Sequence, residues 1–326
     1  MIIAYSANNK FKPFNITSQN PEAINESLWI DLLNPTKEEE TLLENILGID
    51  IPTREEMQEI EVSSRLYKED GAIFMTVTMV AKSDSLQPNT DAVTLILVGN
   101  KLITVRYIEP HSFASIISRI GKILSVDCNA IALLIEILDA SVDRLADILE
   151  KVSHGLDNYS QAIFRSDVNG NAAADKPDYK HHLEAIAVNG DLTTKVQESL
   201  ITFNRLITFF GQISFNNLNS EQQSRLTILA KDINSLSDYV NFLSTKINFL
   251  LDATLGLVNI EQNNIIKIFS IAAVILLPPT LVASIYGMNF HHMPELAWRW
   301  GYPFAILLML IAAWLPYKYF KMKKWL

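Results

Sequence analysis

The feature that most constrains this chain is a run of eighteen uncharged residues near its C-terminus, Ile268–Ile285. A helix of that length is roughly 27 Å long, close to the hydrocarbon thickness of a bilayer. A second uncharged run, Trp300–Tyr317, follows after a short polar connection. Two adjacent apolar helices of spanning length predict a hairpin through a membrane, so the chain before them must lie on one side of it.

Basic residues beside the two runs predict their orientation. Lys267 precedes the first run, and four lysines follow the second: Lys318, Lys321, Lys323 and Lys324. Because cytoplasmic ends of spans are rich in Lys and Arg, we expect both termini in the cytoplasm of a bacterium and the short connection outside its inner membrane. Arg299, a basic residue in that connection, is a minor objection to this orientation. The N-terminus has no charged lead, long apolar core or cleavage site, so it is not a secretory signal.

Charge is divided unevenly along the chain. Of its 27 basic and 36 acidic residues, six basic and one acidic lie after Gln262, so residues 1–262 carry a net charge of −14. Such a body repels nucleic acid and attracts cations, although acidic charge also serves solubility alone. Cys128 is the only cysteine, which excludes an intrachain disulfide and fits a reducing compartment.

Residues 1–110 predict a cytoplasmic α/β domain. Leu28–Leu32 and Ala72–Met79 favour strands, and Asp91–Leu97 with Leu102–Tyr107 favours a hairpin that turns at Gly99-Asn100. Capped helices are expected to begin near Thr36 and Pro52. The domain has no glycine-rich phosphate loop, nucleophile elbow or metal-ligand Cys/His spacing, so we expect neither an enzyme nor a nucleotide cofactor.

Residues 111–262 predict a helical region. Apolar residues recur every three or four positions in three segments: Ser112–Leu124, Asn129–Phe164 and Tyr179–Phe215. The second and third form a hairpin of antiparallel helices around a loop at 165–178. From Ser220 one pattern continues to Asn289, which predicts a helix on the order of 100 Å long that becomes the first span. The expected divisions are 1–110, 111–262, a first span 263–290, a loop 291–299, a second span 300–318 and a tail 319–326.

Two groups of side chains invite a metal-binding hypothesis. Five carboxylates share one face of the second predicted helix: Glu136, Asp139, Asp143, Asp147 and Glu150. This face either is simply solvated or concentrates cations near a pore or sensing site. The pairs His181-His182 and His291-His292 are poor chelators, because adjacent residues on a helix point about 100° apart. Surface or interface roles are the stronger interpretation of both pairs.

Small and polar residues trace one stripe down the first span. The stripe recurs every three or four residues and consists of Asn263, Ile266, Ser270, Ala273, Leu277, Thr280, Ser284 and Met288. It favours either tight helix packing or a water-filled pore lined by one copy from each subunit. Two spans cannot enclose a conduit, so a pore requires an oligomer. Pro278-Pro279 frees backbone carbonyls in mid-membrane, which is tolerable only where protein or water covers them.

Gly287, Met288 and Asn289 follow at the outer end of that helix. Glycine lets the backbone turn or approach a neighbour. The amide oxygen of Asn289 can accept hydrogen bonds from the water shell of an ion. Because Mg²⁺ gives up its waters reluctantly, a ring of neutral amides that holds a hydrated ion is chemically sensible.

The motifs around this segment resemble the CorA family of magnesium transporters. They are Asn259–Asn263, Ile265–Phe269, Leu277–Leu281, Tyr286–Phe290, Met293–Leu296 and Lys323–Leu326. The likeness is strong from about Val258 to Leu326, and the order of an α/β domain, a helical hairpin and one very long helix is similar throughout. A lone Gly-Met-Asn sequence is weak evidence for this family, but its place between two spans makes the match highly specific.

The resemblance implies a funnel-shaped homopentamer in which the first span of each subunit lines the pore. It implies an outer selectivity ring of Gly287, Met288 and Asn289. Four residues match pore-facing positions of the family: Asn263, Ile266, Leu277 and Thr280. It further implies that cytoplasmic Mg²⁺, bound between subunit domains, holds the pore shut, with Asp84 and Asp232 as candidate carboxylates. His291 stands where the family often has an acidic residue.

The function expected is therefore influx of Mg²⁺, and also of Co²⁺ and Ni²⁺, across the cytoplasmic membrane. Two alternatives stay open. One is a zinc transporter with the same architecture, and the other is a membrane-anchored sensor or scaffold in which the stripe only packs helices.

Overall fold

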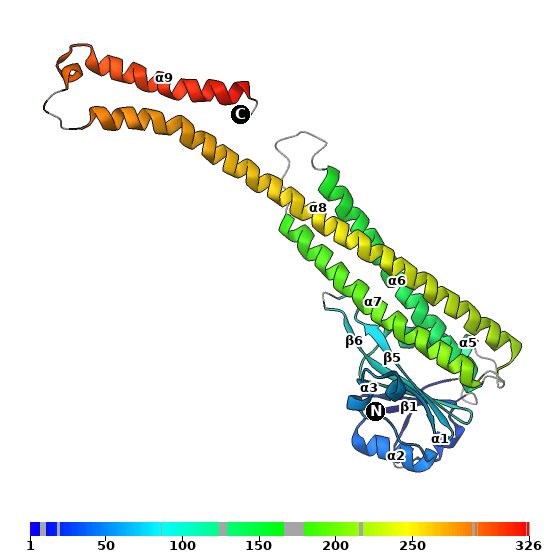
Figure 1. Cartoon of the computed structure of the whole chain (residues 1–326). Helices are drawn as coiled ribbons and strands as arrows, with labels where there is room; N and C mark the ends of the chain where they lie inside the picture. Colours follow the sequence, from blue (N-terminus) through cyan, green and yellow to red (C-terminus); the bar gives the residue numbers. More distant parts are fainter. Residues whose placement is uncertain are drawn as a thin grey trace. The chain divides into compact units, whose positions relative to one another are not determined.

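The computed structural model describes residues 1–6, 11–17, 20–85, 87–123, 129–165, 179–214, 218–288, 291, 293–323 and 325. The chain forms two compact units, Met1–Leu251 and Asp252–Leu326. One continuous helix, α8 (Ser220–Tyr286), contributes to both. Figure 1 shows the sheet and the long helices of the first unit, and the helices α8 and α9 of the second.

The first unit is built on a seven-stranded sheet of order β2-β1-β3-β7-β6-β5-β4. Its strands are β1 (Ile2–Tyr5), β2 (Phe14–Ile16), β3 (Trp29–Leu33), β4 (Leu66–Glu69), β5 (Ala72–Ala81), β6 (Asn89–Val98) and β7 (Lys101–Arg106). Neighbouring strands are antiparallel except β3 and β7, which run parallel with Asp31 opposite Thr104. The α/β domain that the sequence predicts is confirmed, with β1, β2 and β4 in addition.

Local sequence signals explain the clearest of these elements. The β6–β7 hairpin pairs Val98 with Lys101 and turns at Gly99, which has a φ of 56°. Helix α2 (Lys37–Leu47) begins with a capping box, in which the Thr36 hydroxyl accepts from the Glu39 amide and the Glu39 carboxylate accepts from the Thr36 amide. Both predictions are confirmed.

Short helices complete the loops of the sheet. They are α1 (Ala23–Glu26), α3 (Arg54–Met57) and α4 (Val62–Arg65). Thr53 and Glu56 form a capping box at α3, so the helix predicted near Pro52 is confirmed, although it lasts only one turn.

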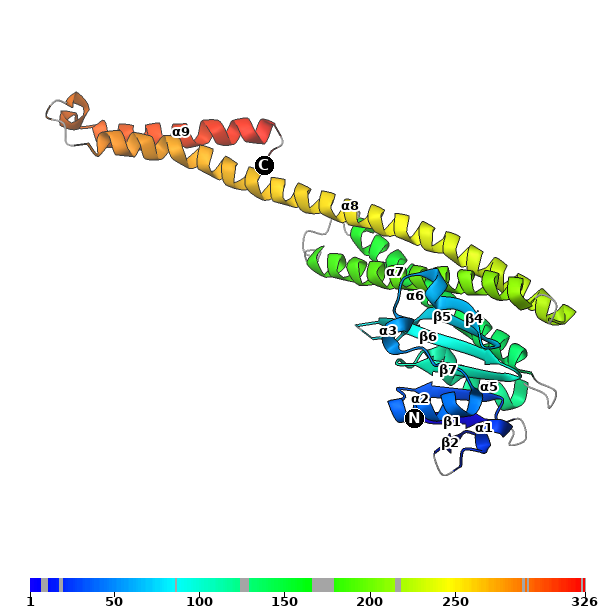
Figure 2. The same cartoon turned by 60° about the horizontal axis from the view of Figure 1, so that its bottom comes forward.

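The sheet separates two apolar layers because side chains alternate between its faces. On one face, Leu43 of α2 and Met57 of α3 pack in one buried cluster with Ile30 and Ile103. Two long helices, α6 (Ala130–Arg165) and α7 (Tyr179–Ser214), cover the other face (Figure 2). There the Ser199 hydroxyl of α7 donates to the carbonyl oxygen of Thr78 at 2.6 Å, which fixes α7 on β5.

The helical region follows the predicted pattern closely. It consists of α5 (His111–Ile123), α6 (Ala130–Arg165), α7 (Tyr179–Ser214) and α8. The predicted loop after α6 lies, apart from Arg165, outside the described residues. Arg225 of α8 forms salt bridges with Glu136 and Asp139 of α6, so charge as well as apolar packing joins these two helices.

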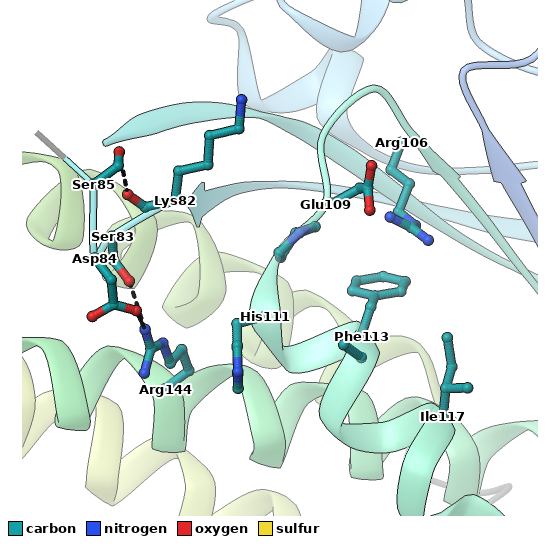
Figure 3. Close-up of a pocket in the computed structure, with 12 residues that line it drawn as sticks. Lys82, Ser83, Asp84, Ser85, Arg106, Glu109, His111, Phe113, Ile117 and Arg144 are labelled. Carbon is teal, nitrogen blue, oxygen red and sulfur yellow. Dashed lines mark hydrogen bonds and ion pairs between the residues drawn. The ribbon is translucent and has the colours of Figure 1, made fainter. Parts of the chain in front are cut away.

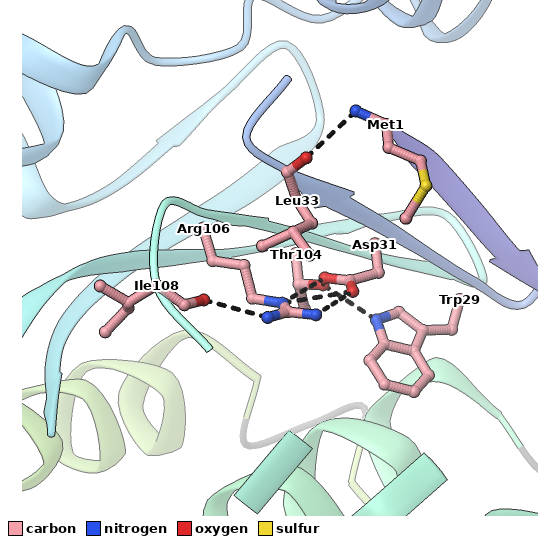
Figure 4. Close-up of polar contacts among 7 residues, drawn as sticks. All are labelled: Met1, Trp29, Asp31, Leu33, Thr104, Arg106 and Ile108. Carbon is pink, nitrogen blue, oxygen red and sulfur yellow. Dashed lines mark hydrogen bonds and ion pairs between the residues drawn. The ribbon is translucent and has the colours of Figure 1, made fainter. Parts of the chain in front are cut away.

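A charged network is buried between the sheet and α5 (Figure 4). The Arg106 guanidinium donates to Asp31 at 2.7 Å, and both side chains are almost fully buried. Thr104 also donates to Asp31 at 2.7 Å, and the Trp29 indole donates to Thr104 at 3.0 Å. The guanidinium lies 4.7 Å from the ring centre of Phe113. Each charge therefore has partners, as a buried ion pair requires.

The second unit is a pair of helices with a short connection. After α8 come η3 (Pro294–Ala297) and α9 (Gly301–Met322). A Cβ atom at Gly301 would lie 2.2 Å from the carbonyl oxygen of Glu295, so only glycine fits where the connection meets α9.

Candidate functional site

Two helices of the described chain are long and apolar enough to cross a membrane, α8 and α9. Helix α8 contains the first uncharged run that the sequence singles out, and α9 contains the second from Gly301 onward. The α8 run is mostly exposed in the single chain, with Ile271 as an exception at 4% exposure. An apolar helix in this state needs lipid or further protein around it.

The stripe lies on an unpartnered side of α8. All eight of its residues are exposed in the single chain, and Ile266 and Leu277 are 61% and 64% exposed. Ile271 lies about 120° around the helix from Leu277, at 100° per residue. The protomer therefore leaves free the face on which Asn263, Ile266, Leu277 and Thr280 were expected to line a pore.

Pro278 and Pro279 lie inside α8 without ending it. Because proline has no N–H, the carbonyls four residues earlier, of Val274 and Ile275, lose their helical donors. The Thr280 hydroxyl donates to two later carbonyls, of Leu276 and Leu277, at 3.1 and 2.8 Å. Thr280 therefore presents oxygen lone pairs rather than a free donor, which suits contact with the water shell of a cation.

The structure describes the end of α8 as far as Met288. The Gly287 amide donates to the carbonyl oxygen of Ala283 at 2.9 Å. A Cβ atom at Gly287 would lie 3.1 Å from that same oxygen, so the close turn favours glycine. Met288 is 47% exposed. Asn289, the centre of the expected selectivity ring, lies outside the described residues.

Asp84, a candidate sensing carboxylate in the turn after β5, forms salt bridges with two basic side chains. Arg144 of α6 pairs with one of its oxygens, and Lys151 donates to the other at 2.8 Å. Arg144 also donates to the Ser83 hydroxyl at 2.7 Å (Figure 3). Lys151 first, and then Arg144, lowers the pKa of Asp84, while burial opposes them. A metal ion that binds Asp84 would compete with these two basic side chains for its oxygens.

The same turn forms one wall of a pocket of about 550 Å³. Arg106, Glu109, His111 and Phe113 lie on the opposite side from Asp84 (Figure 3). The charges around the pocket have mixed signs, so it does not resemble a cation site formed by one chain.

Asp232, the other sensing candidate, is exposed on α8. No hydrogen bond or ion pair joins it to Asp84 in the described part of the protomer. Among the described residues, neither carboxylate belongs to a group of three or more His, Cys, Asp or Glu side chains that could hold a metal ion.

The five-carboxylate face of α6 is divided between two roles. Glu136 and Asp139 bind Arg225, as described above, and burial raises the pKa of Asp139 although Arg225 opposes the shift. Asp143, Asp147 and Glu150 are exposed. Two of the five charges are thus used to join helices, and the rest form a solvated face.

The histidine pairs show no metal centre. Among the described residues, no group of three or more His, Cys, Asp or Glu side chains could hold an ion. The His182 ring lies edge-on to Tyr159, with 6.1 Å between ring centres. His291 is exposed, and His292 lies outside the described residues.

Comparison with known proteins identifies a family. The family described as CorA-like Mg²⁺ transporter protein matches residues 25–323. Magnesium transport protein CorA of Yersinia pseudotuberculosis is 35% identical over 300 residues, or 92% of each chain. The protein of the same name from Escherichia coli K12 is 33% identical over 319 residues, or 98% of each chain.

Solved structures share the fold. The CorA magnesium transporter from Methanocaldococcus jannaschii has a TM-score of 0.75 at 19% identity, over 100% of this chain and 99% of the other. The full-length CmaX protein has a TM-score of 0.62 at 13% identity, over 99% and 97%. At these identities the likeness is one of architecture, and it confirms the predicted α/β domain with one long helix and two C-terminal spans.

Proposed function

The chain belongs to the CorA family of Mg²⁺ transporters, and on that basis we propose that it forms a channel for Mg²⁺ entry through the bacterial inner membrane. The driving force is electrical. A divalent ion gains about 4.6 kcal/mol at 100 mV, so entry needs no nucleotide. We extend the proposal to Co²⁺ and Ni²⁺, with both chain termini in the cytoplasm.

The observation that carries the proposal is the exposed stripe on α8. Its eight side chains are exposed in the protomer, and α8 continues through two prolines that free the carbonyls of Val274 and Ile275. Water in a pore would cover Val274, which lies about 60° from Leu277 on the helix. Five copies around one axis, as in the expected homopentamer, would line a conduit with Asn263, Ile266 and Thr280.

We assign selectivity to the outer end of this helix, at Gly287, Met288 and Asn289. A neutral amide ring accepts hydrogen bonds from a hydrated ion without holding it as strongly as carboxylates would. His291 leaves the mouth with less negative charge than an acidic residue would, so capture of ions there depends more on the amides.

We assign regulation to Asp84 and Asp232. Asp84 is bound by Arg144 and Lys151 in the single protomer. Cytoplasmic Mg²⁺ bound between protomers would compete with these two basic side chains for Asp84. Loss of the ion would restore the salt bridges of Asp84 within its own chain. The pore is then held closed at high Mg²⁺ and released at low Mg²⁺.

Replacing Asp84 with alanine is expected to raise the Mg²⁺ concentration that protects the full-length protein from protease, on the order of tenfold, because one ligand of the regulatory ion is lost. Glu69→Ala serves as the control, since Glu69 is an exposed carboxylate of the same unit. Equal midpoints for wild type and Asp84→Ala would remove Asp84 from the regulatory site.

Uptake into liposomes tests the function itself. In liposomes, the purified protein is expected to transport Mg²⁺ inward when the liposome interior is electrically negative, and to transport little without a membrane potential. Preference for Zn²⁺ over Mg²⁺ would favour the zinc-transporting alternative. Absence of flux for every divalent ion, with the oligomer intact, would favour a scaffold.

A further inference from the structure

An apolar groove runs between the two spans of the second unit. It has a volume of about 530 Å³ and is lined by Ile275 of α8 and by Leu310, Ile311, Ala313, Trp314 and Tyr317 of α9. Apart from the Tyr317 hydroxyl and the Trp314 indole N–H, these side chains offer only carbon. A lining of this kind suits an acyl chain or another apolar helix.

One end of the groove carries positive charge. The Lys318 ammonium lies 4.7 Å from the ring centre of Trp314, and the Lys321 ammonium lies 5.8 Å from that of Tyr317. Leu310, Trp314, Tyr317 and Lys321 follow at intervals of four, three and four residues, so they share one face of α9. Two lysines therefore lie beside the aromatic lining residues at one end of the groove.

The groove lies away from the proposed pore. Ile275 is two residues from Leu277, which places it about 160° around α8 from the stripe. An occupant of the groove would therefore approach from the outside of the hairpin, where lipid surrounds a membrane protein.

Within its spans, a second copy of the chain offers these lysines little charge complementarity. After Gln262 the only acidic residue of the sequence is Glu295, in the connection at the opposite end of both spans. Lipid phosphate is an anion that is abundant at the depth where a span ends, and an aromatic ring with a lysine one turn beyond it is typical of that interface.

We propose that the groove binds one anionic phospholipid, with an acyl chain along Leu310, Trp314 and Tyr317 and the phosphate at Lys318 and Lys321. In the orientation proposed above, the lipid belongs to the cytoplasmic leaflet. The bound lipid fills the groove between α8 and α9, where no other described segment of the same chain packs.

Native mass spectrometry of the purified full-length protein tests this. The protein is incubated with equal amounts of phosphatidylglycerol and phosphatidylcholine that have the same acyl chains. Wild type is expected to retain phosphatidylglycerol preferentially, by about fivefold for each lysine, since a lysine near an anionic surface contributes about 1 kcal/mol. The double variant Lys318→Gln/Lys321→Gln is expected to bind both lipids about equally.

Two further variants separate the explanations. Lys323→Gln removes the same charge from the position two residues beyond Lys321, on another side of the chain, and should keep the preference. Ala313→Phe fills the groove and should lower retention of both lipids. Lipid retention is measured without ion flux, so failure of transport would leave this result standing.

Three results would overturn the proposal. The first is equal retention of both lipids by wild type, and the second is an unchanged preference for phosphatidylglycerol in the double variant. The third is an equal loss of that preference in the double variant and in Lys323→Gln. If Ala313→Phe changes the number of subunits but not lipid retention, a second copy covers the groove instead.

Discussion

Asn289→Ala is expected to lower selective Mg²⁺ uptake by on the order of 100-fold while the protein still assembles. The variant removes an amide oxygen from every subunit at the proposed ring, and a 100-fold loss corresponds to about 2.8 kcal/mol less stabilisation of the hydrated ion. Flux into liposomes, measured for Mg²⁺ alone and in competition with Na⁺, gives both rate and selectivity. Size-exclusion chromatography or native mass spectrometry shows whether the oligomer is intact.

Asn264→Ala is the matched control for this experiment. It makes the same chemical change, but Asn264 lies on α8 about 140° around the helix from Leu277 and so outside the stripe. Uptake by Asn264→Ala should resemble that of wild type. Selective, rapid uptake by Asn289→Ala would show that the ion is chosen elsewhere along the pathway.

Asp31→Ala is expected to destabilise the first unit by about 3–5 kcal/mol, because it leaves the Arg106 guanidinium buried without its counter-charge. The Asp31 side chain is 0% exposed and that of Arg106 is 6% exposed. Thr104 would also lose its acceptor, and with it the ordered position of the Trp29 indole. The measurement is thermal unfolding of the full-length protein in detergent, followed by tryptophan fluorescence.

The double variant Asp31→Leu/Arg106→Met is the informative comparison. It removes both charges and fills a similar volume, so it should be markedly more stable than Asp31→Ala. If the single variant unfolds at the wild-type temperature, the pair contributes little to stability. The Arg106 guanidinium also donates to the carbonyl oxygen of Ile108 at 3.0 Å. If the double variant is as unstable as the single one, loss of this hydrogen bond and of the one from Thr104 to Asp31, rather than the buried charge, accounts for the instability.

The elements predicted correctly from the sequence are those with local causes. The β6–β7 hairpin is set by Gly99-Asn100, and the start of α2 by Thr36 and Glu39. The long α8 is set by an apolar pattern that needs no partner to be recognised. The strands β1, β2 and β4 have three or four residues each. The place of β1 in the sheet depends on its pairing with β3, more than twenty residues later, which short-range patterns do not predict. Strand β4 pairs with β5 across the two-residue turn Asp70-Gly71, a local hairpin signal from which β4 was predictable.

The candidate site was predictable in part for the same reason. The stripe follows from helical spacing, and the structure places seven of its eight positions on exposed turns of α8, with Met288 exposed just beyond the helix. The partners of Asp84 were not predictable, because Arg144 and Lys151 follow it by 60 and 67 residues. Nor did the spacing of the α6 carboxylates show that Arg225, on another helix, binds two of them. Such contacts depend on the tertiary arrangement.

The two prolines of α8 have a mechanical consequence. Two consecutive carbonyls, of Val274 and Ile275, lack the hydrogen bonds that stiffen the rest of the rod, so bending stiffness is lowest there. A bend at this point breaks fewer bonds than a bend elsewhere along the helix. The part of α8 after Pro279 can therefore pivot while the part before Val274 keeps its axis. In the pore proposed above, the outer mouth would then change diameter separately from the inner one.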